Sequence, residues 1–361
     1  MRFFQIQYSR FVHIFPAMKQ SFTVRTIPYV VFFVLTFVHN AVAQQALHRL
    51  AGMQGGITGA SFSKDGSLIL VSGTNGLSIY DANTEQVRTT VPAQGNITAA
   101  ISPDNNMLLV ANSSNELEIY TLQNGANARQ VSKRKLQTHI STLDFRADGR
   151  YYAIGTDDGR IAVMDAQHAT VFTTVMEAIP FADKKAGGSY TAVSSLRFID
   201  NDRLMAFAGN GEVKAFDVNS GRQVYALEYY RNVIYSPSDD SPVQCDMATG
   251  GNKLLCSRSG NAFILDLSTY DIVGKTAQPG LRSCAIAPSG ALVLACDATH
   301  VYVYNSDLSH RDANRVSLAG IVSRPDIKQV LISPSVNKVL ICSGNELLIA
   351  DYQSFGKLTG K

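Results

Sequence analysis

The feature that most constrains the fold is a repeat that occurs seven times after residue 50. Each copy has an apolar strand ending in Phe, Ile or Met, a polar turn, a second apolar strand, and a third one usually followed by Asp. The last apolar residues of the first strands mark the copies: Phe62, Ile101, Phe145, Phe198, Met247, Ile286 and Ile332. Successive markers are 39, 44, 53, 49, 39 and 46 residues apart. A period of about 45 residues is typical of a four-stranded propeller blade.

The repeats have the chemistry of strands. Short segments rich in Val, Ile, Leu and Tyr alternate with Gly, Asn, Asp and Ser turns, and no segment after residue 50 holds a helical apolar period for long. A single sheet of this kind cannot bury both faces, whereas seven sheets around an axis cover one another. The sequence therefore predicts an all-β fold in one domain, a seven-bladed β-propeller of four-stranded antiparallel blades with almost no helix.

Residues 1–43 differ from the repeats. Lys19 and Arg25 precede twelve mostly apolar residues, 27–38, and Ala41-Val42-Ala43 is followed by Gln44. This three-part form predicts a secretory signal peptide cleaved after Ala43. A signal peptide counted from Met18 would have the usual length, which indicates Met18 as the true start. An uncleaved anchor helix is the alternative, but twelve residues span only about 18 Å of a hydrocarbon core of about 30 Å. We therefore predict a signal peptide over 1–43 and a propeller over 44–361.

Export also changes the charge of the protein. The full chain has 32 basic and 29 acidic residues, a formal net charge of +3. Residues 1–43 contain four basic residues and no acidic residue, so residues 44–361 contain 28 basic and 29 acidic residues. A near-neutral domain has no broad basic surface for nucleic acid. The one basic cluster, residues 133–135, is interpreted as a solvated loop between blades two and three.

The five cysteines allow two interpretations. A turn at Gly250-Gly251 would place Cys245 opposite Cys256, and a turn centred on Gly290 would place Cys284 opposite Cys296. Two hairpin disulfides are therefore possible in an oxidising compartment. Because the composition is not rich in cysteine, the alternative that all five are small buried apolar side chains is favoured.

The copy marked by Phe145 resembles a WD40 repeat. His139 precedes its first strand, Gly155-Thr156 ends the second, Asp158 begins the turn, and residues 161–165 form the third. The chain is thus similar to the WD40-repeat family and its looser YVTN-type relatives. In that family a His, a Ser or Thr, an Asp and a Trp form a hydrogen-bonded tetrad, which implies a structural role for His139, Thr156 and Asp158.

The resemblance is incomplete at the Trp position. The chain contains no Trp, and Met164 occupies the Trp position of the third copy, so the tetrad cannot be completed. Other copies have aromatic or aliphatic residues there: Tyr80, Tyr120, Phe216, Leu265, Tyr304 and Ala350. The resemblance therefore implies a propeller without naming a WD40 subfamily.

Recognisable catalytic motifs are scarce in the sequence. The histidines are scattered, and no nucleophile elbow, phosphate loop or dinucleotide fingerprint occurs in a strand-to-helix context. An Asp recurs after the third strand, at Asp81, Asp165, Asp217, Asp266 and Asp351. A ring of carboxylates for a metal is one interpretation, but an Asp that begins a turn is better explained by bonding its own backbone two residues on. We predict no enzyme activity, no cofactor and no metal.

Extra chain in the two longest repeats points to a binding surface. It falls at residues 178–191 and 229–242, between the last strand of one blade and the first of the next, and both stretches should emerge on the same rim. The candidate partner-binding residues are Phe181, Lys184, Lys185, Tyr190, Tyr229, Tyr230, Arg231 and Tyr235. Aromatic residues and Arg suit a protein interface, although solvated variable loops are the alternative.

Taken together, these features predict an exported, monomeric, non-enzymatic scaffold that binds another protein in the periplasm, at the cell surface or outside the cell. Its contact with membrane is limited to the transient signal peptide. The alternative function is a propeller enzyme of the lactonase or hydrolase type with a metal in the central channel. That alternative requires several Asp, Glu, Asn or His side chains to converge on one mouth of the channel.

Overall fold

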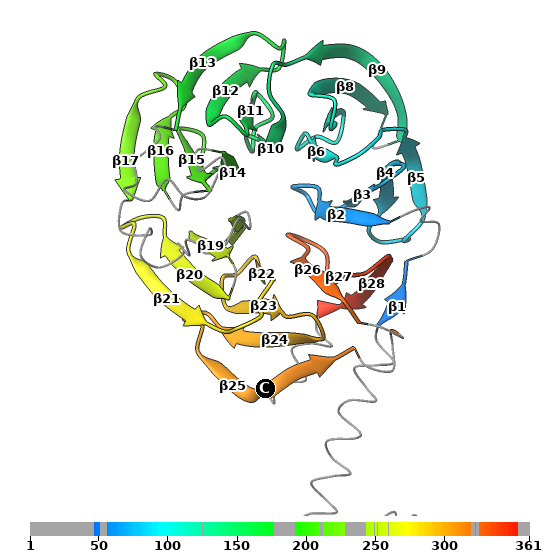
Figure 1. Cartoon of the computed structure of the whole chain (residues 1–361), viewed down its shortest axis with the longest axis vertical. Helices are drawn as coiled ribbons and strands as arrows, with labels where there is room; N and C mark the ends of the chain where they lie inside the picture. The colour runs from blue at the N-terminus through cyan, green and yellow to red at the C-terminus, as the bar shows by residue number, and fades with distance from the viewer. Residues whose placement is uncertain are drawn as a thin grey trace, which may run out of the picture. The chain divides into compact units, whose positions relative to one another are not determined.

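The computed structural model describes residues 47–50, 56–123, 126–176, 192–209, 212–227, 243–248, 250, 252–258, 260–318, 322 and 325–352. Every regular element in this part of the chain is a β-strand, and the strands form seven four-stranded antiparallel sheets. Figure 1 shows the sheets arranged as blades around one axis. The predicted seven-bladed β-propeller is therefore confirmed. Within the described ranges, no helix combines the length and hydrophobicity that crossing a membrane requires.

Each blade contains four strands, called a to d from the axis outwards. The a strands are β2 (Ile57–Phe62), β6 (Thr98–Ile101), β10 (Ile140–Phe145), β14 (Val193–Phe198), β18 (Gln244–Ala248), β22 (Ser283–Ile286) and β26 (Ile327–Ile332). The b strands are β3 (Leu68–Gly73), β7 (Met107–Ala111), β11 (Tyr151–Thr156), β15 (Arg203–Ala208), β19 (Lys253–Arg258), β23 (Leu292–Cys296) and β27 (Lys338–Ser343).

The outer half of each blade completes the pattern. The c strands are β4 (Gly76–Asp81), β8 (Glu116–Gln123), β12 (Arg160–Asp165), β16 (Val213–Asp217), β20 (Asn261–Asp266), β24 (His300–Asn305) and β28 (Glu346–Asp351). The d strands are β5 (Val87–Val91), β9 (Ala126–Lys135), β13 (Thr170–Val175), β17 (Gln223–Leu227), β21 (Ile272–Ala277) and β25 (His310–Ser317), with β1 (His48–Arg49) as the d strand of the last blade.

The sequence markers coincide with the strands nearest the axis. Six of the seven markers end an a strand, and Met247 lies one residue before the end of β18. The b strands are almost continuously buried, as in β3, because neighbouring blades cover both faces of the sheet. The d strands alternate between half-buried and exposed residues, as in β21, because one side faces solvent. Continuous apolar runs in the sequence thus mark the b strands inside a blade, and alternating patterns mark the outermost d strands.

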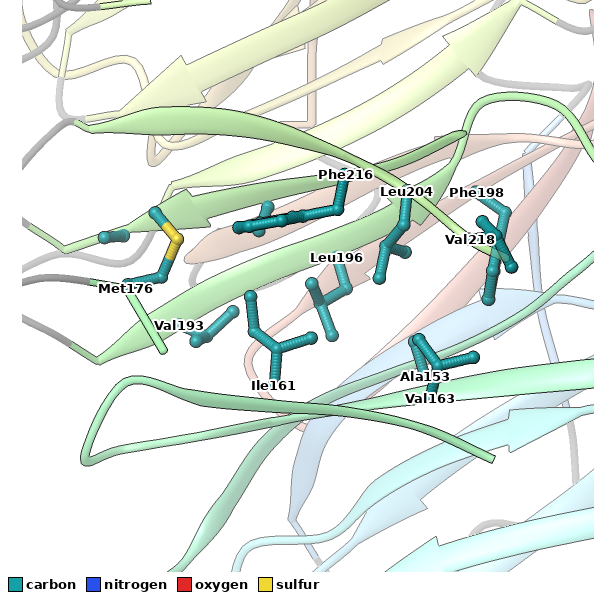
Figure 2. Close-up of a cluster of buried hydrophobic side chains, with 12 residues drawn as sticks. Ala153, Ile161, Val163, Met176, Val193, Leu196, Phe198, Leu204, Phe216 and Val218 are labelled. Atoms are coloured by element: carbon teal, nitrogen blue, oxygen red, sulfur yellow. The ribbon is translucent and has the colours of Figure 1, made fainter. Parts of the chain in front are cut away.

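The hydrophobic core lies between blades. Figure 2 shows the cluster between blades three and four, where side chains from the two sheets interlock. Its members are Ala153, Ile161, Val163, Met176, Val193, Leu196, Phe198, Leu204, Ala206, Ala208, Phe216 and Val218. Burial of each large aliphatic or aromatic side chain of this kind contributes about 1.5–3 kcal/mol. Because every cluster needs two blades, no blade is stable on its own.

The residues at the Trp position of the repeat take part in this packing. Tyr80, Tyr120, Met164, Phe216, Leu265, Tyr304 and Ala350 are all buried. Tyr80 packs in the cluster between the last blade and blade one, and Leu265 in the cluster between blades four and five. The position therefore fills the space between blades with side chains of several sizes, which explains how the fold forms without Trp.

The ring is closed by β1. His48 pairs with Ile349 and Arg49 with Leu348 of β28, and the Leu50 amide donates to the Leu347 carbonyl at 2.8 Å. Leu50 is also buried between the last blade and blade one. The segment before blade one therefore supplies the outer strand of the last blade.

Antiparallel pairing gives the ring two distinct faces. The a–b and c–d turns lie on one face, which we call the a–b face. The b–c turns and the connections from each d strand to the next a strand lie on the other, which we call the d–a face.

Two details of the sequence interpretation are corrected. Lys133, Arg134 and Lys135 lie on strand β9 and not in a loop, because blade two has the longest d strand, although all three are exposed. Cys284 pairs with Ala295, while Cys296 pairs with Ser283. The β22–β23 hairpin is thus shifted by one residue from the predicted register, which places these two cysteines on opposite faces of the sheet.

Candidate functional site

The predicted partner-binding residues lie outside the described part of the chain. They are Phe181, Lys184, Lys185, Tyr190, Tyr229, Tyr230, Arg231 and Tyr235. The segment 177–191 joins β13 to β14, and 228–242 joins β17 to β18, so both are d–a connections. The strand ends that flank the two segments therefore lie on the d–a face. That these residues bind a partner stays a prediction.

The structural residues of blade three are only partly brought together. The Thr156 hydroxyl donates to Asp158 Oδ1 at 2.6 Å and fixes the β11–β12 turn. His139 lies instead beside Asp157, with 3.3 Å between His139 Nδ1 and Asp157 Oδ2. Met164 accepts a weak hydrogen bond from the Thr170 hydroxyl. The mapped contact from His139 to Asp158 is thus replaced by a contact with the neighbouring carboxylate, because the turn directs Asp158 towards Thr156.

Four of the five recurring Asp residues begin c–d turns, as the sequence predicts; Asp351 ends β28, whose outer neighbour is β1. Asp81 Oδ1 accepts the backbone N–H groups of Asn83 and Thr84, and Asp165 and Asp266 accept the amide two residues on in the same way. Asp217 accepts the amide three residues on. For these four blades the carboxylate is therefore used by its own turn, which confirms the turn interpretation.

Asp81 gives a prediction for the dependence of stability on pH. Burial opposes its ionisation, but the Thr84 and Asn83 amides and the Arg88 guanidinium outweigh this and lower its pKa to about 2. A pKa below the ordinary value of 3.8 means that ionised Asp81 stabilises the fold above pH 4, and that this contribution disappears as the pH falls through 2. We expect Asp81→Asn to cost about 2 kcal/mol at pH 7. In urea titrations the difference in free energy of unfolding between wild type and Asp81→Asn should decrease from pH 5 to pH 2. A difference that does not change with pH would contradict the prediction.

The same turns contain residues that the sequence did not single out. In five blades the fourth or fifth residue of the turn has a positive φ of 60–68°: Glu85, His168, Gly221, Tyr270 and Leu308. These residues reach the preceding blade. Glu85 forms an ion pair with Lys338 of the last blade at 3.0 Å, and the Tyr270 ring stacks on Tyr225 of blade four with centroids 4.2 Å apart. A left-handed conformation in a bulky residue is uncommon, so its recurrence indicates a constraint from the neighbouring blade.

In blades three and four the c–d turn also contacts the preceding blade, but through a backbone carbonyl and a glycine. Arg134 of blade two donates to the carbonyl of His168 at 3.1 Å. At Gly221 a Cβ atom would lie 2.8 Å from the Phe172 ring of blade three, so only glycine fits against that ring. The c–d turn of each of these blades therefore acts as a clasp on the blade before it.

The a strands are joined by a second set of contacts around the axis. A side chain three residues before the marker of one blade accepts the backbone N–H two residues before the marker of the next. The pairs are Thr142 with Leu196, Ser283 with Val330, and Gln329 with Ala60. The Gln329 amide also donates to the Ala60 carbonyl at 3.2 Å, so it binds both backbone groups of that residue. This last pair joins the final blade to the first.

A group of charged side chains lies near the a–b face end of the a strands; this axial charge group comprises Lys64, Asp144, Arg197 and Asp246. Asp144 is buried and accepts the Phe198 N–H of blade four at 2.8 Å. Its other oxygen lies 3.0 Å from Lys64 Nζ and 3.9 Å from the Arg197 guanidinium. One carboxylate therefore connects blades one, three and four.

Asp246 occupies the same repeat position in blade five. It accepts the Ile286 N–H of blade six at 2.9 Å, as Asp144 does for blade four. Burial raises the pKa of its carboxyl, although the Ile286 amide and Arg197 act in the opposite direction. Arg197, which lies 3.9 Å from Asp144, also donates to the Cys245 carbonyl at 3.1 Å, next to Asp246 in the chain. Each of the two carboxyl groups thus accepts a backbone N–H from the next blade.

An aromatic cluster lies on the a–b face between blades four and five. Arg203 donates to the Tyr270 hydroxyl at 2.6 Å, lies over the same ring at 5.5 Å, and pairs with Asp200. Tyr225 covers the other side of Tyr270. These half-buried groups bind one another, so their arrangement fixes the clasp of blade five.

Histidine and carboxylate side chains such as His168, His300 and Asp144 have partners within the protein. In the described ranges, no three His, Cys, Asp or Glu side chains converge closely enough to hold a metal ion. His168 Nδ1 lies 3.1 Å from the Tyr152 hydroxyl, and His300 Nδ1 lies 2.7 Å from the Thr299 hydroxyl, so each ring contacts a local side chain. The recurring polar groups of the ring therefore serve the contacts between blades.

Comparison with known proteins agrees with this architecture. Among solved structures, the beta-propeller domain of Cps50 (Swd1) from Myceliophteria thermophila superposes with a TM-score of 0.66. The match covers 84% of this chain and 99% of that domain at 14% sequence identity, which shows a shared fold. No curated protein matches the sequence significantly.

A family model gives a more specific result. The model described as the NUP159/214 beta propeller matches residues 52–237, just over half of the chain. The matched range includes blades one to four. It also includes the clasps of blades one, three and four, the axial group members Lys64, Asp144 and Arg197, and the first long d–a connection. The chain therefore belongs to the NUP159/214 beta propeller family.

Proposed function

We propose that this chain is an exported, WD40-like, non-enzymatic propeller that binds another protein through its d–a face. The observation that carries the proposal is the position of the two long connections. On the a–b face and around the axis, recurring charged and aromatic groups hold the blades together. The extra chain of the two longest repeats lies in successive d–a connections, and long loops on a rigid support are where binding residues concentrate.

The composition of the connections favours a protein as the partner. The segment 228–242 contains three tyrosines and an arginine, the residue types that dominate binding energy at protein interfaces. The segment 177–191 adds Phe181, Tyr190 and the Lys184-Lys185 pair. The near-neutral charge of the chain after residue 43 argues against nucleic acid.

The axial group supports a structural use over a metal site. Asp144 and Asp246 are the carboxylates that a channel enzyme would need, but both bind backbone amides of the next blade and face Lys64 or Arg197. Two cations beside two carboxylates oppose the binding of a further cation.

Export is supported by where the described fold begins. The first strand is β1, at His48, so cleavage after Ala43 would leave every described strand in the mature protein. Cleavage of such a signal peptide would therefore remove none of the described strands.

One experiment tests both parts of the proposal. The protein is purified from its native host as wild type and as the triple variant Tyr229→Ala, Tyr230→Ala, Arg231→Ala. Associated proteins are quantified by mass spectrometry, and the intact mass locates the first residue. We expect a mature chain that begins at Gln44, and loss of the principal partner by more than about tenfold in the triple variant, because hot-spot residues carry most of the binding energy.

The matched control is the double variant Arg129→Ala, Val131→Ala on the exposed strand β9. It should retain the partner and melt within about 2 °C of wild type, since exposed substitutions have small effects on stability. The melting temperature of the triple variant is measured alongside, so that loss of the partner is distinguished from loss of the fold. An unchanged set of partners in the triple variant would refute the binding face. A first residue before Gln44 would refute the export.

A further inference from the structure

One pair of cysteines lies in register in blade five. Cys245 of β18 is directly opposite Cys256 of β19, and their Sγ atoms are 3.5 Å apart. Opposed residues in antiparallel strands have Cα atoms about 4.5–5.5 Å apart, within the range of about 4.4–6.8 Å that a disulfide spans. Rotation of the two side chains is enough to bring the sulfur atoms to bonding distance.

The other three cysteines are differently placed. Cys284 and Cys296 point to opposite faces of their sheet, since Cys284 pairs with Ala295 and Cys296 with Ser283. Cys342 faces Gln329 on one side and Leu347 on the other. All five are thiols in this structure. Among them, only Cys245 and Cys256 occupy paired positions.

We propose that Cys245 and Cys256 form a disulfide in the mature protein, which locks the hairpin on which the long connection 228–242 ends. The inference rests on the proposed export, because disulfides persist in oxidising compartments. Cys245 is the third described residue after that connection, and Val243 before it is buried. The bond therefore fixes the base of the candidate binding segment.

The oxidation is a two-electron exchange. One cysteine thiolate attacks a sulfur of an oxidised dithiol carrier, such as a disulfide-donor protein or glutathione disulfide, and displaces one carrier thiolate. The second cysteine thiolate then attacks the mixed disulfide and releases the other carrier thiolate. The two cysteines lose two protons and two electrons, and the carrier gains them as two thiols.

Burial sets the time at which this exchange occurs. Cys256 is fully buried and Cys245 nearly so, within the cluster between blades four and five. Burial, and then the neighbouring Cys245, raise the pKa of the Cys256 thiol well above its usual value. Because the thiolate is the attacking species, the bond forms while the hairpin is still accessible, before blade five packs against blade four.

The proposal is tested on the protein purified from its native host. Free thiols are alkylated under denaturing, non-reducing conditions, and the peptides are mapped by mass spectrometry. We expect one linked pair, Cys245 with Cys256, and alkylation of Cys284, Cys296 and Cys342. Reduction of the folded protein should be slow and should need denaturant. Reduced protein should melt roughly 5 °C lower than oxidised protein, since closing a loop of this length stabilises the fold.

Two variants identify which cysteines form the disulfide. Cys245→Ala should abolish the link and the response of the melting temperature to reductant, whereas Cys284→Ala should leave both unchanged. Five alkylated cysteines, or a link that involves another cysteine, would overturn the proposal. The first residue of the same sample decides the export separately. A chain that begins at Gln44 with five free thiols would leave export standing and the disulfide refuted.

Discussion

A chain that begins at Gly52 is expected to melt on the order of 10 °C below a chain that begins at Gln44. The shorter chain lacks β1, so β28 loses the strand that pairs with it. It also lacks Leu47 and Leu50, two buried side chains whose burial contributes about 1.5–3 kcal/mol each. For a domain of this size, each kcal/mol corresponds to about 2–4 °C in melting temperature. Differential scanning calorimetry of the two purified chains measures the difference.

The chain that begins at Gln44 is also the control, since it keeps every described strand. Leu50→Asp within it separates burial from strand pairing. The substitution should destabilise by about 3 kcal/mol or more, because it places a charge among the residues between the last blade and blade one. Equal melting temperatures for the two chains would show that the last blade is stable with three strands and that β1 is dispensable.

Removal of the carboxylate at Asp144 is expected to lower the free energy of unfolding by about 3 kcal/mol. Asp144→Ala takes the acceptor from the Phe198 N–H and the partner from Lys64, so blades one, three and four lose a common contact. Lys64 and Arg197 are about 30% exposed at their side chains, which allows water to compensate part of the loss. Urea denaturation followed by circular dichroism measures the cost.

Asp144→Asn separates the hydrogen bond from the charge. The amide oxygen can still accept the Phe198 N–H, so this variant should lose about 1 kcal/mol, less than half of the loss in Asp144→Ala, because only the ion pair with the partly exposed Lys64 is removed. Combining Asp144→Ala with Lys64→Ala should cost less than the sum of the two single substitutions. A loss below about 0.5 kcal/mol for Asp144→Ala would mean that the axial charge group does not join the blades.

The repeat carried most of the information about the fold. A marker such as Phe62 could be placed from the sequence because the pattern of an apolar strand, a polar turn and a second apolar strand is local. The number of blades followed from counting such markers. The turn role of Asp81 was predictable for the same reason, since its side chain binds only groups within seven residues, at Asn83, Thr84 and Arg88.

Register within a hairpin was predictable only where the turn was unambiguous. Gly250-Gly251 placed Cys245 opposite Cys256 correctly. In blade six the turn around Gly290 is centred half a residue earlier than predicted, which moves Cys296 opposite Ser283. A shift of one residue reverses every side chain on one strand, so a small error in the turn changes which cysteines can meet.

The contacts between blades could not be obtained from the sequence. Gln329 binds Ala60 across 269 positions of the chain, and Lys338 binds Glu85 across 253. Neither pair has a local signal, because their distance depends on the closure of the whole ring. The left-handed position of Tyr270 has no signal either, since the residue types that favour it are absent there. The candidate partner-binding residues, from Phe181 to Tyr235, lie outside the described ranges and await the binding experiment.

The closure of the ring by β1 has a consequence for biosynthesis. The strand made first finds its partner only when β28, some 300 residues later, has left the ribosome. Contacts so distant in sequence form slowly, and a nascent chain that lacks the final blade cannot complete its toroid. The ring therefore cannot close until translation is nearly complete, and the proposed export would take advantage of this, because a translocation channel threads an unfolded chain.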